Sequence, residues 1–135
     1  MTPVSTLLKL CVTLFSIATT TGAIADVVVD PEILAATTTG RARVIVELRL
    51  ENGFTPEGQL TRQGVLAQRE AIEAAQRAVL SELGDGDARV VRQLEAVPFV
   101  ALEIGARALA DLRAMPDRVL RILRDDTAAA QQPQE

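Results

Sequence analysis

The sequence predicts an α+β domain in which a four-stranded antiparallel sheet carries two helices on one face. Two observations support this prediction. Apolar residues alternate with polar ones, or form short runs, in four strand-length segments, residues 41–51, 89–94, 99–104 and 118–125. Helical spacing of apolar residues appears in residues 60–83 and 106–114. The resulting order is that of the βαββαβ fold known as ferredoxin-like, whose helices leave the other sheet face open.

The first strand and the first helix have clear inward faces. In residues 41–51, one side of the predicted strand carries Val44, Val46, Leu48 and Leu50, and the other carries Ile45, Glu47 and Arg49. Glycines and a proline then predict a loop over residues 52–58. In the helix of residues 60–83 the inward stripe contains Val65, Ile72, Val79 and Leu83, widened by Leu66, Ala75 and Leu80.

The second half of the chain predicts a hairpin, a short helix and a last strand. Residues 89–94 and 99–104 are separated by residues 95–98, whose proline favours a tight connection. In the later strand Val100, Leu102 and Ile104 alternate with Phe99, Ala101 and Glu103. Gly105 opens the helix of residues 106–114, with Leu109 and Leu112 inward. The pattern of residues 118–125 does not decide which side of this strand points into the core. Leu120 and Ile122 lie on one side, and Val119 and Leu123 lie on the other.

The two ends of the chain are predicted to lie outside the domain of residues 41–126. Residues 1–25 read as a signal peptide: Lys9, a short apolar run and a small-residue cleavage site before Asp26. An uncleaved anchor is disfavoured because the run falls short of the ~20 apolar residues that span a bilayer. A lipoprotein signal at Cys11 is disfavoured by the bulky Leu10. The protein is therefore expected to be secreted or periplasmic.

Residues 26–40 are expected to form a loosely held N-terminal arm or linker, with at most one helical turn after Asp30 and Pro31. Residues 127–135 carry no pattern that predicts packing, so they are expected to form a free C-terminal tail.

Composition excludes several classes of function. Removing 25 residues from 135 leaves 110, with 13 arginines, 18 carboxylates and no lysine, cysteine or histidine. This set offers no catalytic triad, no thiolate nucleophile and no usual zinc ligands, so we expect no enzyme activity, metal or cofactor. The net acidity and the scarcity of aromatic residues argue against nucleic-acid binding. No membrane association is expected after signal cleavage.

Two acidic motifs are better explained as ordinary structure. Asp85 and Asp87 flank a glycine as in calcium loops, but the further ligands of such loops are missing, so a turn is favoured. Asp125 and Asp126 resemble a carboxylate pair for acid–base chemistry. Neighbours on an exposed strand end point to different sides, and a solvated strand end is the simpler interpretation.

The outer sheet face is more informative. Ile45, Phe99 and Ala101 would lie on the two central strands, on the face without helices. Scattered apolar surface residues need no explanation, but a cluster rimmed by Glu47, Arg49 and Glu103 is typical of a protein-docking surface.

Three segments carry a family resemblance: VIVELR at residues 44–49, VVRQLEAVPFVALEI at residues 90–104, and ALADLRAMPDRVLRILRDD at residues 108–126. Together they resemble the propeptide domain of subtilisin-like serine proteases and the free-standing inhibitors related to it. The resemblance covers residues 43–126 and rests on order and spacing, since no single residue is diagnostic.

The resemblance implies a docking mode. The open sheet face would pack on two surface helices of the protease, with Asp125 matching an acid that caps a helix N-terminus. Leu123 stands where some members carry a second acid. The tail would occupy the active-site cleft as an added strand through Thr127, Ala128, Ala129, Ala130 and Gln131. No catalytic domain follows Glu135, so the chain is expected to act in trans or to be a remnant of a proenzyme.

The expected function is thus an exported inhibitor, or folding assistant, of a subtilisin-like serine protease. A small-molecule-binding or regulatory module on the same fold remains an alternative, which predicts an enclosed pocket and an unimportant tail. A structural domain of an envelope assembly is a third.

Overall fold

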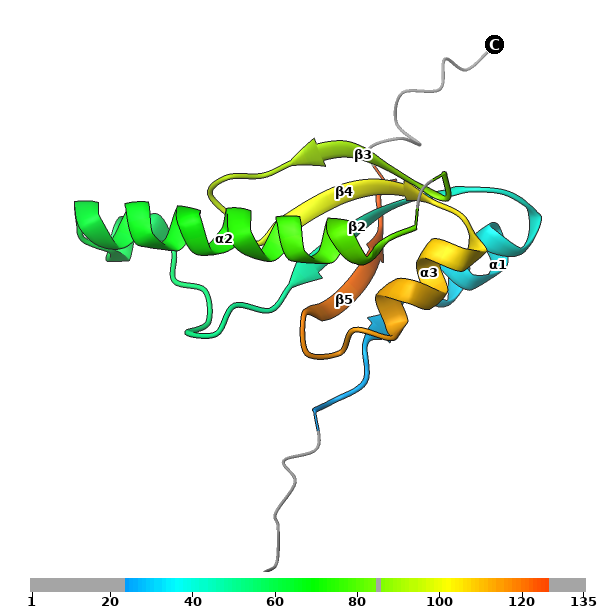
Figure 1. Cartoon of the computed structure of the whole chain (residues 1–135), viewed down its shortest axis with the longest axis horizontal. Helices are drawn as coiled ribbons and strands as arrows, with labels where there is room; N and C mark the ends of the chain where they lie inside the picture. Colours follow the sequence, from blue (N-terminus) through cyan, green and yellow to red (C-terminus); the bar gives the residue numbers. More distant parts are fainter. Residues whose placement is uncertain (1–23, 85, 127–135) are drawn as a thin grey trace, which may run out of the picture.

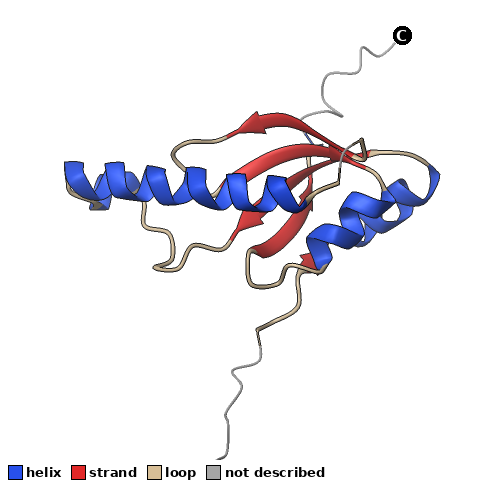
Figure 2. Ribbon diagram, in the orientation of Figure 1, coloured by secondary structure: helices blue, strands red, loops and turns tan. Residues whose placement is uncertain are grey.

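The computed structural model describes residues 24–84 and 86–126, which form an α+β architecture of one mixed sheet and three α-helices (Figures 1 and 2). In chain order the elements are β1 (Val28–Val29), α1 (Pro31–Thr39), β2 (Ala42–Leu48), the 3₁₀ turn η1 (Glu57–Gln59), α2 (Arg62–Glu82), β3 (Ala88–Gln93), β4 (Phe99–Ile104), α3 (Ala106–Arg113) and β5 (Val119–Arg124). The strand order in the sheet is β1-β5-β2-β4-β3. Among the strand pairs of this described part of the chain, only β1–β5 is parallel.

The predicted α+β class is confirmed, but the prediction of four antiparallel strands and two helices is wrong in detail. The described chain has a fifth, parallel strand and a third helix, and both come from the segment expected to be a loose arm. The Asp30 side chain caps α1 by accepting a hydrogen bond from the Glu32 backbone N–H at 3.0 Å. Ile33 then enters the core with 1% of its surface exposed. Residues 28–39 are therefore part of the folded domain.

The core lies on one face of the sheet. Val44, Val46 and Leu48 of β2 are almost fully buried, as the alternation predicted. Val44 lies opposite Leu102, and Val46 lies between Val100 and Ile122, so three strands present their inward residues together. The helices add Ile33 of α1, Val79 of α2, and Ala108, Leu109 and Leu112 of α3 to the same cluster. Burial of each Val, Leu or Ile side chain stabilises the fold by about 1.5–3 kcal/mol. The core can therefore be built from aliphatic side chains without aromatic ones.

An irregular register resolves the facing of β5. Arg121 lies opposite Glu47, yet Val119 lies opposite Leu48, so Leu120 is an extra residue that β2 does not match. Val119 and Ile122 consequently both point into the core, with 0% exposure each. A strand with an inserted residue loses its two-residue periodicity, which explains why the sequence pattern was ambiguous.

Helix α2 extends beyond the sheet that it covers (Figure 1). Thr61 caps its start by accepting a hydrogen bond from the Gly64 N–H at 3.1 Å. Ile72 and Val79 are buried as predicted, whereas Leu66, expected to widen the inward stripe, is 60% exposed. No strand of the described chain lies beneath the N-terminal part of the helix. The apolar spacing of the sequence continues there, but its side chains have no sheet to pack against.

A buried glutamine fastens α2 to the β3–β4 connection. Gln76 Nε2 donates hydrogen bonds to the carbonyl oxygens of Leu94, at 2.8 Å, and Phe99, at 3.0 Å. We predict that Gln76→Ala lowers the free energy of unfolding by about 2 kcal/mol, because two hydrogen bonds from a buried amide to backbone carbonyl groups are lost. Urea denaturation measures this loss. Gln63→Ala, at an exposed position of the same helix, is the control, and an equal effect of both substitutions would contradict the prediction.

Candidate functional site

The sheet face opposite the helices is the main candidate site. Ile45 on β2 lies directly opposite Ala101 on β4, and Glu47 lies opposite Phe99. Glu103 lies on the same face, opposite Arg43. The structure thus brings together five of the predicted site residues, each partly exposed. Leu123, which is 37% exposed and lies opposite Ile45 on β5, extends their apolar centre.

Ion pairs between neighbouring strands surround this apolar centre. Arg121 of β5 contacts Glu47 of β2 at 2.6 Å, and Arg89 of β3 contacts Glu103 of β4 at 2.8 Å. The hydrogen bond that Arg121 donates to the Glu47 carboxylate, together with the negative charge of Glu47, raises the pKa of the Arg121 guanidinium. The two acids predicted at the rim are therefore already held by arginines of adjacent strands. Arg49, the third predicted rim residue, follows the end of β2, and its Nε donates to the Pro116 carbonyl at 3.3 Å.

Asp125 does not form the solvated strand end that the sequence suggested. Only 7% of the residue is exposed, its carboxylate lies 3.4 Å from the Arg43 guanidinium, and its N–H donates to the Arg43 carbonyl at 3.1 Å. The chain after β5 thus stays bound along β2. Asp126 is the exposed acid at this end, with a 2.6 Å contact to Arg124. The predicted cleft-binding residues, Thr127 to Gln131, lie outside the described part of the chain.

A pocket of about 260 Å³ opens on the same sheet face. Its lining combines apolar side chains with two arginines and the buried acid: Arg43, Ile45, Val91, Arg92, Leu94, Ala101 and Asp125. The Nε of Arg43 is buried and has no hydrogen-bond partner among the described residues. Two-residue alternation could have assigned Arg43 to this face. It could not have assigned Val91, because the β3–β4 register shifts between Val90 and Arg92.

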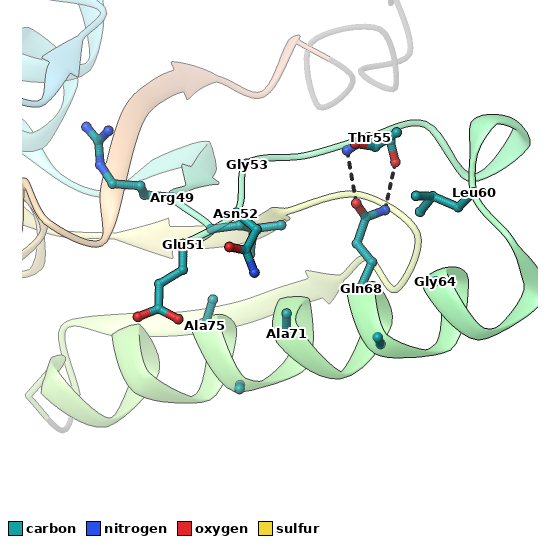
Figure 3. A pocket seen from close by; sticks show the side chains of 13 residues that line it. Arg49, Glu51, Asn52, Gly53, Thr55, Leu60, Gly64, Gln68, Ala71 and Ala75 are labelled. Carbon is teal, nitrogen blue, oxygen red and sulfur yellow. Dashed lines mark hydrogen bonds between the residues drawn. The ribbon is translucent and has the colours of Figure 1, made fainter.

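A second pocket, of about 460 Å³, lies between α2 and the loop that follows β2 (Figure 3). Glu51 and Asn52 lie on the loop side, and Gly64, Ala71 and Ala75 on the helix side. Small helix residues leave this space unfilled. Sequence reasoning missed the pocket because it depends on how the loop is fastened to the helix.

Polar contacts hold that loop over α2. The Thr55 N–H donates to Gln68 Oε1 at 2.9 Å, and Gln68 Nε2 donates to the Thr55 carbonyl at 2.8 Å (Figure 3). Glu57 accepts two hydrogen bonds from Arg69, at 2.7 and 3.0 Å. These hydrogen bonds lower the pKa of the Glu57 carboxyl. These contacts fix the loop that forms one wall of the pocket.

The described residues contain no group of three or more acidic, histidine or cysteine side chains that could hold a metal ion. Over the same part of the chain, no helix has the length and apolar character needed to cross a bilayer. Comparisons of the chain with protein-family models, with curated proteins and with solved structures find no match. The proposals on function therefore rest on the open sheet face and on the pocket beside α2.

Proposed function

We propose that this protein is an exported inhibitor, a folding assistant, or both, of a subtilisin-like serine protease. The open sheet face docks on the enzyme, and the C-terminal tail enters the active-site cleft. The order β5-β2-β4-β3, antiparallel throughout, supports a ferredoxin-like core to which β1 and α1 are added at the β5 edge. This is the architecture that the resemblance to subtilisin propeptides implies.

One observation carries the proposal: the uncovered sheet face has an apolar centre and a charged rim. Ile45, Phe99, Ala101 and Leu123 share this face, and ion pairs border it. A fully desolvated apolar centre inside a polar rim is the usual anatomy of a protein–protein interface. Because the rim acids are already neutralised by neighbouring arginines, docking on this face would not leave isolated carboxylates in the interface.

The exposed acid at the end of β5 suits the contact with an enzyme helix. The Asp126 side chain is exposed, whereas the Asp125 side chain is buried and paired with Arg43. A carboxylate near a helix N-terminus is stabilised by the unsatisfied N–H groups there and by the helix dipole. The proposal therefore assigns the helix-capping role to Asp126 in place of Asp125.

Inhibition and folding assistance follow from the same contacts. A surface that binds only the native enzyme stabilises the native state by mass action, so it favours folding. A tail held in the cleft as an extended strand blocks substrate in the same place. Slow cleavage of that tail would make inhibition temporary.

The test is inhibition of a panel of subtilisin-like proteases by residues 26–135. We expect competitive inhibition, which a form that ends at Asp126 loses. Ile45→Asp is expected to weaken inhibition by about 100-fold or more, because a charge is then buried at the centre of the interface. Leu66→Asp, a matched change at an exposed position on α2, is expected to leave inhibition unchanged. Failure of the intact form to inhibit any protease of the panel would reject the proposal.

The pocket beside α2 favours a second candidate, a small-molecule-binding or regulatory module. Its volume of about 460 Å³ falls in the range of about 300–1,000 Å³ typical of ligand sites. This function predicts that neither form of the chain inhibits a protease and that removal of the tail leaves ligand binding unchanged. The panel experiment therefore distinguishes the two candidates.

A further inference from the structure

We propose that the pocket on the open sheet face accepts the carboxylate of a glutamate side chain from the protein that docks there. This inference rests on the proposed docking role of the face and specifies the chemistry that the partner must present. The pocket lies within the interface itself, since Ile45 and Ala101 belong both to its lining and to the apolar centre of the face.

The first argument is an unused hydrogen-bond donor. The guanidinium of Arg43 contacts Asp125 through one terminal nitrogen at 3.4 Å, while its Nε is buried without an acceptor among the described residues. A buried N–H group that lacks an acceptor is unfavourable, and a turn of the partly exposed Arg43 side chain toward an incoming oxygen would remove that cost. A carboxylate oxygen is the strongest acceptor that a protein side chain offers to a guanidinium.

The second argument is the charge balance of the lining. The carboxylate of Asp125 is already paired with Arg43, so the charge of Arg92 is left over. Arg92 is exposed and forms no ion pair within residues 24–84 and 86–126. The whole chain carries a net charge of −4, which makes a locally positive pocket unusual for this protein. An anionic group is therefore favoured there over a cationic one.

The third argument is the apolar wall. Ile45, Val91 and Ala101 line the pocket together with the arginines. The two methylene groups of a glutamate side chain can contact this wall while the carboxylate reaches the guanidinium groups. Burial of these methylenes adds affinity that an inorganic anion would not gain.

The test titrates N-acetylglutamate amide, which keeps only the side-chain carboxylate, into the isotope-labelled protein expressed from its full sequence. N-acetylglutamine amide is the uncharged control of the same shape. We expect chemical-shift changes at the Arg43 Nε–H, Ile45 and Ala101. The glutamine compound should bind about tenfold more weakly than the glutamate compound, because a charge-assisted hydrogen bond is lost. Equal binding of the two compounds, or shifts that map to another surface, would overturn the inference.

Two substitutions localise the site without breaking the buried ion pair. Arg92→Gln removes the excess charge, and Ala101→Leu fills the pocket, so both should weaken binding of the acid severalfold or more. Arg107→Gln, the same charge change at an exposed position on α3, should have no effect. Retained chemical-shift dispersion of the protein's backbone N–H signals shows that each variant is folded. Unchanged binding in both pocket variants would also reject the site.

The outcomes separate this inference from the proposed function. A chain that binds the glutamate probe but inhibits no subtilisin-like protease would keep the pocket and reject the protease as partner. A chain that inhibits the protease but binds neither probe would keep the function and reject the pocket.

Discussion

Replacement of Ile33 by alanine is expected to lower the free energy of unfolding by about 3 kcal/mol. Ile33 is 1% exposed and belongs to the core cluster that joins the three helices to the sheet. Truncation removes buried methyl groups and leaves a cavity, and the surrounding side chains close it only in part. Urea denaturation of residues 26–135 measures the change, and a constant m-value shows that the unfolding reaction is the same.

Leu34→Ala is the matched control for this prediction. Leu34 occupies the next position of α1 and is 41% exposed, so its truncation should change stability far less. If Ile33→Ala proved as mild as Leu34→Ala, α1 would be a detachable arm, as the sequence had suggested. A large difference would establish that the folded domain begins before residue 41.

Gly105→Ala is expected to destabilise the protein by about 2 kcal/mol, through loss of a helix cap in addition to steric strain. A Cβ atom at position 105 would lie 2.1 Å from the Asp87 Oδ1 atom, so the carboxylate must move. That carboxylate accepts a hydrogen bond from the Ala108 N–H at 2.7 Å and thereby caps α3 from a distant part of the chain. Thermal and urea denaturation both report the loss.

A double-mutant cycle isolates the contact between these two residues. Asp87→Ala alone should cost about 1 kcal/mol through loss of the cap. In that background Gly105→Ala should cost little, because the atoms that it displaces are gone. Gly58→Ala is the control for glycine replacement in general, since a Cβ there meets no atom within 4 Å. Additive effects of the Asp87 and Gly105 substitutions would contradict the steric explanation.

Sequence reasoning located β4 and all of β2, although the predicted range of residues 41–51 runs past the end of β2 at Leu48, because each strand has an unbroken two-residue period. Val44 and Leu102 were assigned to the core, and Ile45 and Ala101 to the opposite face, from local alternation alone. The same reasoning failed for Leu66, since helical periodicity shows which side of a helix is apolar but not where the sheet beneath it ends.

The candidate site was predicted in part for a related reason. The apolar centre of the open face follows from strand periodicity and strand order. The pocket beside it depends on a register shift in β3 and on the burial of Asp125, neither of which has a local pattern. Asp87 was predicted only to lie in a turn, and its role as a cap for α3 requires residues 21 positions apart to meet.

The sequence by itself determined the type and order of the six central elements and the inward faces of the two central strands, because these depend on neighbours two to four positions away. Only the tertiary structure decided that residues 28–39 join the domain, that Asp125 is buried against Arg43, and that two pockets form. Each of these features depends on contacts between residues far apart in the chain. Their free energy comes from burial and pairing that exist only after the sheet has assembled.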